Sequence, residues 1–139
     1  MIRGAVLGSP ISHSLSPVLH KAAFDFLGLA GNYSAIEVTS GTLQEFVETR
    51  GQEFDYLSLT MPLKEEVLSL DVDTDALTQR IQSGNTLVNR DGTWSLTSTD
   101  GSGLVAALAH AGLTQFESVL ILGAGGTARA VTGALDSLA

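Results

Sequence analysis

The fold is decided at residues 58–66, which read SLTMPLKEE. Residues 54–59 form an apolar run that is typical of a buried strand, and the chain then enters a helix. Pro62 suits the first helical position, because its fixed φ matches a helix and its missing N–H is not needed there. Glu65 and Glu66 suit the first turn, where the helix dipole favours negative charge. This step from strand to helix indicates an α/β fold.

Lys64 is the unusual residue of this stretch, since a cation at a helix N-terminus opposes the helix dipole. In open α/β sheets, ligands bind at the carboxyl ends of the strands, and Lys64 would lie at such an end. A solvent-exposed lysine that balances its acidic neighbours is the plain alternative. The local sequence favours neither interpretation over the other.

The composition is that of a compact α/β domain. A length of 139 residues suits one domain, or one domain and the beginning of a second, and 44% hydrophobic residues can fill a core. The chain has no cysteine, which excludes disulfides and thiolate metal sites. A net charge of −8 without a basic patch argues against a nucleic-acid partner. Since no apolar run has membrane-spanning or signal-peptide length, we expect a cytoplasmic protein without a membrane partner. The sequence contains no cluster of metal-ligating residues, so we expect no metal, and we expect a monomer or homodimer.

The residues before this stretch predict two further strands with helices between them. Residues 2–7 and 32–38 are short apolar runs that are typical of strands in a mainly parallel sheet. The first helix would begin with Ser16 as its N-cap and Pro17 at its first position. The side chains expected to face the core from this helix are Val18, Leu19, Ala22, Ala23, Phe26 and Leu27.

The residues after this stretch predict a hairpin, a helix and one more strand. The Asp-Gly dipeptide at residues 91–92 separates two alternating runs, so we predict a β-hairpin over residues 85–97. A helix is predicted over residues 102–111, with Asp100 as its N-cap. Residues 118–122 are predicted to form a strand, and a last helix follows it.

A glycine loop lies between this last predicted strand and helix. Residues 123–128 read GAGGTA, which matches the Gly-x-Gly-x-x-Ala fingerprint of dinucleotide sites in the required context. Gly123 would permit the tight turn, Gly125 would let the backbone approach a pyrophosphate, and Ala128 would allow close packing of helix and strand. A plain glycine turn is the alternative. The residue that reads the ribose follows ~20 positions later, beyond Ala139, so the sequence does not distinguish NADP from NAD.

Polar residues follow the first strand and flank the hairpin. Ser12, Ser14 and Ser16 alternate after the first strand, and hydroxyls at this spacing would suit a small oxyanion. A helix cap at Ser16 with two solvated serines is the simpler explanation of this pattern. Asn85 suits a turn and Asp100 suits a helix cap, so neither residue by itself requires a function.

Taken together, these motifs resemble those of shikimate dehydrogenases, in their order and approximate spacing and over all 139 residues. The motifs are Ser14-Leu15-Ser16-Pro17, Thr60-x-Pro62-x-Lys64, Asn85-Thr86, Thr99-Asp100-Gly101 and Gly123-Ala124-Gly125-Gly126. The resemblance implies a shikimate-binding domain at residues 1–101, followed at residues 102–139 by a linker helix and the first βα unit of a Rossmann domain that binds NADP. It also implies the NADPH-dependent, reversible reduction of 3-dehydroshikimate to shikimate in aromatic amino-acid biosynthesis.

The resemblance also implies roles for individual residues. The implied substrate-binding residues are Ser14, Ser16, Thr60, Lys64, Asn85 and Asp100. Among them, Ser14 and Ser16 would hold the substrate carboxylate, and Lys64 beside Asp100 would be the acid/base group. The implied cofactor-binding residues are Gly123, Ala124, Gly125, Gly126, Thr127 and Ala128.

Two features separate this chain from the usual family pattern. Ser58 and Ser98 stand where the family commonly has Asn, which puts one substrate hydrogen bond in doubt. The resemblance further implies that most of the cofactor domain, and a C-terminal helical segment that returns to the substrate domain, lie beyond Ala139. We therefore expect these 139 residues alone to bind shikimate weakly, to fail to bind NADP and to show no turnover.

Two alternatives stay open. A quinate/shikimate dehydrogenase of broader specificity would need only small changes around the substrate carboxylate, although a serine at both position 14 and position 16 favours shikimate. A non-catalytic sensor of shikimate or quinate could be built on the same domain. The presence of both Lys64 and Asp100 argues against the sensor, because ligand binding alone does not need an acid/base lysine.

Overall fold

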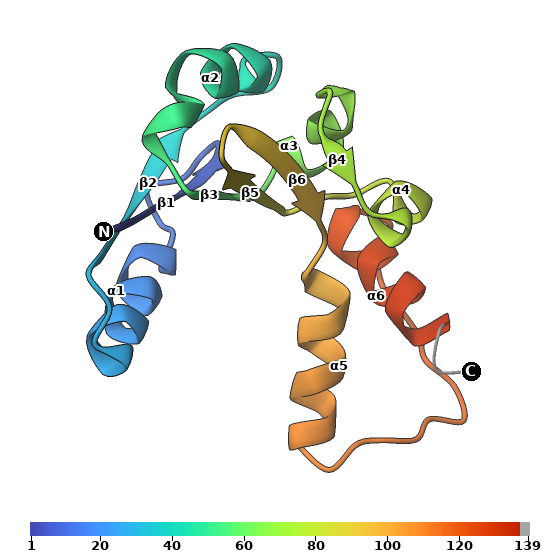
Figure 1. Ribbon diagram of the computed structural model, residues 1–139. Coiled ribbons are helices and arrows are strands. Elements are labelled where there is room, and N and C mark those ends of the chain that lie inside the picture. Colours follow the sequence, from blue (N-terminus) through green and yellow to red (C-terminus); the bar gives the residue numbers. More distant parts are fainter. Residues whose placement is uncertain (137–139) are drawn as a thin grey trace.

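The computed structural model describes residues 1–136 and shows a six-stranded sheet with helices on both faces (Figure 1). The strands are β1 (Ile2–Gly8), β2 (Gly31–Glu37), β3 (Tyr56–Leu59), β4 (Asp73–Thr74), β5 (Thr86–Arg90) and β6 (Thr93–Thr97). The helices are α1 (Ser16–Leu27), α2 (Leu43–Arg50), α3 (Leu63–Glu66), α4 (Ala76–Ile81), α5 (Asp100–His110) and α6 (Gly126–Asp136). The predicted α/β class is confirmed.

The strand order is β2-β1-β3-β5-β6-β4, and the sheet is mixed. β1 runs parallel to both β2 and β3, and β4 runs parallel to β6. β5 is antiparallel to β3 and to β6, because the predicted hairpin joins β5 to β6. Its two turn residues, Asp91 and Gly92, have φ values of 53° and 87°, as the favoured two-residue hairpin turn requires. The hairpin prediction is therefore confirmed, and antiparallel pairs accompany the parallel ones.

One side of the sheet, which we call the α2 face, is closed by α2 and α3. Its core consists mainly of leucines that are almost completely buried: Leu7, Leu43, Leu57, Leu63, Leu87 and Leu96. The Glu66 carboxylate of α3 accepts hydrogen bonds from the backbone N–H groups of Gly41 (2.9 Å) and Leu43 (3.2 Å). These groups lie at the start of α2, so Glu66 caps that helix and ties α3 to it.

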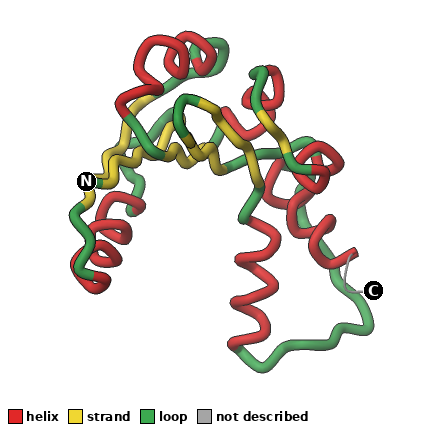
Figure 2. The backbone as a smooth tube through the Cα atoms, viewed as in Figure 1, coloured by secondary structure: helices red, strands yellow, loops and turns green. Residues whose placement is uncertain are grey.

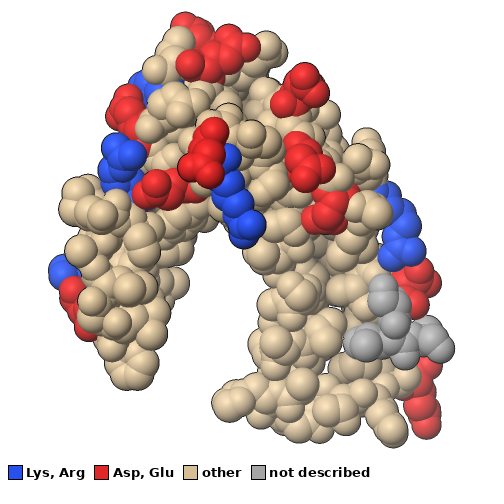
Figure 3. Space-filling view, in the orientation of Figure 1, with Lys and Arg blue, Asp and Glu red and all other residues tan. Residues whose placement is uncertain are grey.

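The opposite side, which we call the α1 face, is only partly covered. Phe24 of α1 packs there against Val6, Ile11 and Tyr33, and the His20 ring stacks on Tyr33 with 3.7 Å between ring centroids. In the space-filling view, this side of the molecule is hollowed between α1 and α5, and most residues that border the hollow are uncharged (Figure 3). The α1 face therefore leaves polar and apolar side chains accessible.

The predicted core-facing stripe of α1 is wrong. Leu19 and Phe26 are 66% and 89% exposed, and Val18 and Leu27 are exposed as well. The helix packs on the sheet through Phe24 and His20, which lie on a neighbouring side of the helix. Within residues 1–136, nothing covers the larger apolar stripe.

The strand predicted at residues 118–122 is not formed. The tube view shows this segment as a loop between α5 and α6 (Figure 2), and Leu120 and Leu122 are 85% and 90% exposed. A strand needs a hydrogen-bonded neighbour, and within residues 1–136 none lies beside this segment. The βα unit expected here is therefore represented only by its glycine loop and its helix.

α5 leaves the sheet after β6, and α6 returns to pack against α5 and α4 (Figure 1). Gly101 permits the crossing of α5 and α6. A Cβ atom at this position would overlap the Ala130 carbonyl oxygen and would lie 2.8 Å from the Ala134 Cβ. None of the helices within residues 1–136 has the length and apolarity that a membrane crossing requires.

Candidate active site

An ion pair between Lys64 and Asp100 forms the centre of the site. Lys64 Nζ lies 2.5 Å from Asp100 Oδ2, and the two side chains are 18% and 19% exposed. Lys64 belongs to α3, which follows β3, and Asp100 is the first residue of α5, which follows β6. The pairing contradicts the interpretation of Lys64 as a plain surface lysine.

The predicted helix caps at Asp100 and Ser16 are each displaced by one residue. Thr99 holds the cap position of α5, and Asp100 lies within the first turn with its carboxylate bonded to Lys64. Leu15 holds the cap position of α1 and makes no side-chain cap hydrogen bond. Neither Asp100 nor Ser16 therefore caps its helix through a side-chain hydrogen bond.

Asn85 fixes the orientation of Asp100. Its Nδ2 donates to Asp100 Oδ1 at 2.7 Å, and its Oδ1 accepts from the backbone N–H of Thr99 at 3.0 Å. Both amide atoms are thus used in holding the start of α5 against the hairpin. Asn85 is therefore not just a turn residue, as its local sequence would allow, because it also links the hairpin to Asp100 and Thr99.

The glycine loop reaches the same ion pair through Thr127. The Thr127 hydroxyl lies 3.1 Å from Lys64 Nζ and donates to Asp100 Oδ2 at 3.0 Å. The sequence places Thr127 in the loop but gives no sign of this contact, because the contact depends on the path by which α6 returns to the sheet. Sequence reasoning named Thr127 only as a cofactor residue and missed its contact with the ion pair.

A cavity of about 420 Å³ joins the loop to the lysine. Its lining includes Thr60, Lys64, Gly123, Gly125, Gly126, Thr127 and Ala128. Ala124 instead lines a neighbouring cavity on the side of Arg129. The structure therefore brings the proposed acid/base pair, Thr60 and most of the predicted cofactor residues into one place.

Contacts from α6 to α3 and α4 hold the loop in position. Arg129 forms an ion pair with Glu65 at 2.6 Å and donates to the Gln82 carbonyl oxygen at 2.9 Å. At Gly126, an added Cβ would lie 2.5 Å from the buried hydroxyl of Ser83, so any other residue there would force Ser83 to move. Glu65, which suits the dipole of its own helix, therefore also anchors α6.

The loop has the features that a dinucleotide pyrophosphate requires. Gly123 has a φ of 123°, a conformation that glycine adopts far more readily than other residues. A Cβ at Gly125 would meet no atom within 4 Å, so the backbone there is open to a ligand. The N-terminus of α6 supplies free N–H groups beside it, which favour a phosphate. These residues fit the pyrophosphate part of NADP.

Ser14 and Ser16 lie apart from this cavity. Ser14 Oγ accepts a hydrogen bond of 3.3 Å from the backbone N–H of Ser16, and neither residue lines the cavity beside Lys64. Their loop does start at the same end of the sheet, where the Ser9 N–H donates to the Met61 carbonyl oxygen at 3.0 Å. The structure thus places both serines on a neighbouring loop and does not bring them into contact with the pair.

The two tyrosines of the α1 face, Tyr33 and Tyr56, are uncharged at neutral pH. Burial raises the pKa of Tyr56 to about 12, and the neighbouring Tyr33 adds to this rise. Burial also raises the pKa of Tyr33, against a smaller opposing effect of Ser58. These phenols therefore add no negative charge to the side of the sheet that α1 and its serines border.

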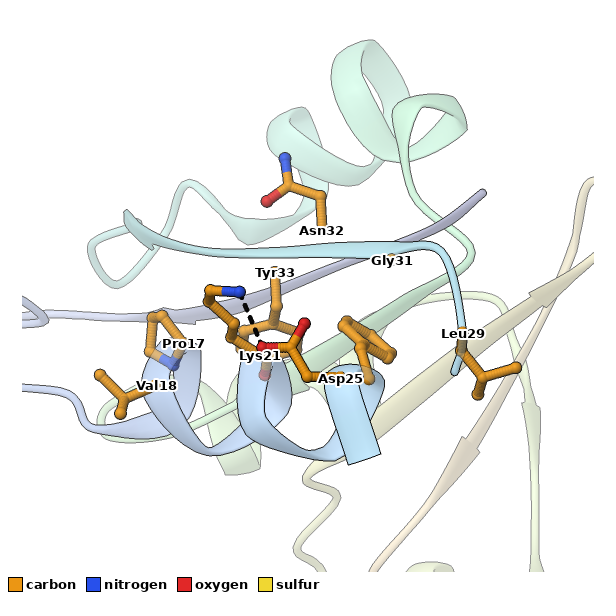
Figure 4. A pocket seen from close by; sticks show the side chains of 9 residues that line it. Pro17, Val18, Lys21, Asp25, Leu29, Gly31, Asn32 and Tyr33 are labelled. Atoms are coloured by element: carbon orange, nitrogen blue, oxygen red, sulfur yellow. Dashed lines mark hydrogen bonds and ion pairs between the residues drawn. The ribbon is translucent and has the colours of Figure 1, made fainter. Parts of the chain in front are cut away.

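A second cavity, of about 470 Å³, lies between α1 and β2 (Figure 4). The Lys21 ammonium and the Asp25 carboxylate on its wall pair with each other at 2.8 Å. None of the predicted substrate or cofactor residues lines it, and its remaining polar lining consists mainly of Asn32 and Tyr33. It is distinct from the cavity that contains Lys64.

Comparison with known proteins matches residues 6–87 to the shikimate dehydrogenase substrate binding domain. This is more than half of the chain. The chain belongs to this family. A shikimate dehydrogenase (NADP(+)) from Exiguobacterium is 43% identical over 135 residues, which are 96% of this chain and 51% of that protein.

Solved structures of other proteins share the fold of this chain. Shikimate 5-dehydrogenase from Thermus thermophilus in complex with NADP(H) and shikimate superimposes with a TM-score of 0.93 at 39% identity, over 99% of this chain and 52% of that one. A 5-ketofructose reductase of Gluconobacter superimposes with a TM-score of 0.87 at 27% identity, over 99% of this chain and 50% of that one. The chain spans about half the length of the curated relatives it matches.

Proposed function

We propose that the protein to which this chain belongs is an NADP-dependent shikimate dehydrogenase that reversibly reduces 3-dehydroshikimate to shikimate. The observation that carries the proposal is the 2.5 Å ion pair of Asp100 with Lys64, the lysine that lines the cavity beside the glycine loop. Family membership and the names of the relatives support it. A proton donor next to a dinucleotide loop is what the reduction of a ketone by hydride transfer requires.

In this proposal, residues 1–101 form the substrate domain, and residues 102–139 form a linker helix and the beginning of the cofactor domain. The sheet and its leucine core lie entirely before residue 98, and α5 leads away from them, which supports this division. The cofactor-binding residues would be Gly123, Ala124, Gly125, Gly126, Thr127 and Ala128. They would hold the pyrophosphate of NADP, with NAD as the less favoured cofactor.

The chemistry assigned to this chain is the movement of one proton. The glycine loop would hold NADP, and the bound cofactor would supply or accept the hydride of the reaction. Lys64 donates a proton to the oxygen of the ketone as the alkoxide develops, and it takes the proton back in the reverse direction. Asp100 holds the Lys64 ammonium, and Asn85 holds Asp100, so the donor is fixed before substrate arrives.

The remaining predicted residues would bind the substrate. Ser14 and Ser16 would donate hydrogen bonds to its carboxylate, and Thr60 and Asn85 would bind ring hydroxyls together with Asp100. The loop of the serines begins beside Met61, next to Thr60, which supports a ligand that extends from the cavity toward them. The neutral phenols of the α1 face are compatible with an anionic ligand.

The test is to titrate shikimate and quinate against the purified protein while the absorbance of NADPH is followed. Turnover of shikimate alone supports the proposal, and comparable turnover of quinate would establish the broader dehydrogenase instead. Binding of either acid without turnover would establish a sensor. The same assay on residues 1–139 alone is expected to show weak shikimate binding and no turnover, and turnover there would mean that the cofactor site is misplaced.

A further inference from the structure

We propose that Thr127 is a positioning residue for the Lys64–Asp100 pair, and that its hydroxyl couples the glycine loop to the proton donor. The inference rests on the proposed function, since it gives Thr127 a part in that reaction. It goes beyond the role of a loop residue that contacts the cofactor. Two observations support it: the hydrogen bonds of the Thr127 hydroxyl to the pair, and a separate ion pair that holds α6 against α3.

The Thr127 hydroxyl acts both as a donor and as an acceptor beside Lys64. A hydroxyl has one proton to donate and can also accept. Thr127 Oγ1 donates to Asp100 Oδ2 at 3.0 Å, and it accepts from Lys64 Nζ at 3.1 Å. Because Lys64 also donates to Asp100, the three side chains close a triangle.

This triangle leaves one proton of the ammonium available. Of the three N–H groups of Lys64, one is bonded to Asp100 and one to Thr127, and within residues 1–136 the third has no partner. The two bonds fix the direction of the third N–H. Thr127 therefore helps to orient the third N–H of Lys64, which carries the proton to be transferred.

The contact of Thr127 is held by a second, independent connection between α3 and α6. Glu65, next to Lys64, pairs with Arg129, two residues beyond Thr127, at 2.6 Å. The close packing of Gly126 on Ser83 adds a steric limit. α6 thus touches α3 at two points, and these contacts hold the backbone of Thr127 beside the pair.

A ligand on the glycine loop must therefore act on the proton donor. Any displacement of the loop carries Thr127 with it and changes two hydrogen bonds of the ion pair. Valine has nearly the same shape as threonine but no hydroxyl, so Thr127→Val removes both bonds and keeps the packing. Serine keeps the hydroxyl, so Thr127→Ser is the conservative variant.

The first experiment compares Thr127→Val and Thr127→Ser in the whole protein by the pH dependence of kcat and by both KM values. We expect Thr127→Val to lower kcat about tenfold and to move its pH profile, the effect of one hydrogen bond to a charged group. The KM for shikimate should stay close to that of the wild type, and Thr127→Ser should retain both kcat and the profile. Thr132→Val is the matched control, because within residues 1–136 the Thr132 hydroxyl bonds only to the Ala128 carbonyl oxygen of the same helix.

The second experiment measures the exchange of the Lys64 ammonium protons with water by NMR, in the same proteins. Thr127→Val should speed this exchange about tenfold, because the ammonium loses one hydrogen bond. Lys21 is the internal reference, since it is the only other lysine of this chain and pairs with Asp25 on α1. The exchange of Lys21 should not change.

Two results would overturn the inference. One is a Thr127→Val enzyme with the wild-type kcat and pH profile and a raised KM for NADP, which would make Thr127 a cofactor ligand alone. The other is unchanged exchange of the Lys64 protons in that variant. If the wild-type protein shows no dehydrogenase turnover, the proposed function fails, and the exchange measurement still decides whether Thr127 holds the ammonium.

Discussion

On the α2 face of the sheet, Leu7, Leu57 and Leu87 are completely buried, whereas on the α1 face Leu19 and Phe26 are largely exposed beside a hollow. Both faces are formed by the same strands, whose side chains alternate between them. The apolar side chains of the α2 face are buried in a closed core. The α1 face leaves polar groups and an open surface next to the serine loop. The comparison indicates that stability is concentrated on the α2 face, whereas the residues for which we propose a function lie at the rim of the sheet, on the loops and helix ends that follow its strands.

The largest expected effect breaks the closed face. Leu57→Ala should lower the free energy of unfolding of this chain by about 3 kcal/mol, because it leaves a cavity in a packed core. Leu19→Ala, the matched change on the exposed stripe of α1, should cost less than about 0.5 kcal/mol. Urea unfolding of both variants measures the difference. Equal losses would show that the two faces do not differ in this way.

The next effect concerns the rim, where α3 presents its lysine. Lys64→Ala should lower kcat of the whole protein by ~10² or more with a much smaller change in KM, the scale of general acid–base contributions. Lys21→Ala removes the other lysine of this chain and should leave kcat unchanged. Steady-state kinetics with shikimate would decide, and a Lys64→Ala enzyme with near-normal kcat would remove the acid/base assignment.

A smaller effect is expected from the serine loop. Ser14→Ala should weaken shikimate binding by ~1–3 kcal/mol, which is typical of a hydrogen bond to a charged group, and should leave NADP affinity nearly unchanged. Ser12→Ala, an exposed serine of the same loop, is the control. Calorimetric titration with shikimate measures both variants. Wild-type affinity in Ser14→Ala would place the carboxylate elsewhere.

The smallest effect is expected at Asp75, which follows the edge strand β4 and lies outside the buried clusters of both faces. Asp75 caps α4, and its carboxylate accepts from the Thr78 backbone N–H at 2.7 Å and from the Thr78 hydroxyl at 3.0 Å. Burial acts to raise the pKa of Asp75, but these hydrogen bonds outweigh it and the pKa is lowered. Asp75→Ala should therefore cost about 1 kcal/mol of stability at neutral pH.

The pH dependence of this loss follows from the lowered pKa. The stabilisation from Asp75 is present above its unfolded pKa of about 4 and is lost as the pH falls through the lower folded value. The difference in unfolding free energy between wild type and Asp75→Ala should thus shrink in acid. Asp75→Asn keeps a capping oxygen and serves as the control that does not titrate. A difference that stays constant down to pH 2 would contradict the assignment.

Local rules predicted those parts of the molecule whose causes are local. The hairpin follows from Asp91-Gly92, since few other residues adopt two successive positive φ values. The family resemblance predicts that Lys64 and Asp100 are neighbours. The direct ion pair between them needed the structure.

The wrong or missing predictions share one cause: each depends on a neighbouring segment that the local sequence does not specify. The apolar periodicity of α1 identifies its apolar side but not the surface that covers it, and the helix packs through Phe24 instead. Residues 118–122 have the composition of a strand but no strand beside them within residues 1–136. The contact of Thr127 with Lys64 depends on the return of α6, which no local pattern encodes.

The crossing at Gly101 has an evolutionary consequence. A methyl group at this position would push α6 outward, and the Thr127 hydroxyl, on the same helix, would be drawn away from Asp100. The hydrogen atom at Gly101 thus sets the spacing between the glycine loop and the proton donor. Because the nearest obstacle to a side chain at position 101 is the backbone carbonyl oxygen of Ala130, no change of side chain elsewhere can make room for it. We therefore expect an alignment of relatives with the same helix crossing to show glycine at this position, as a mark of the spacing between the two halves of the site.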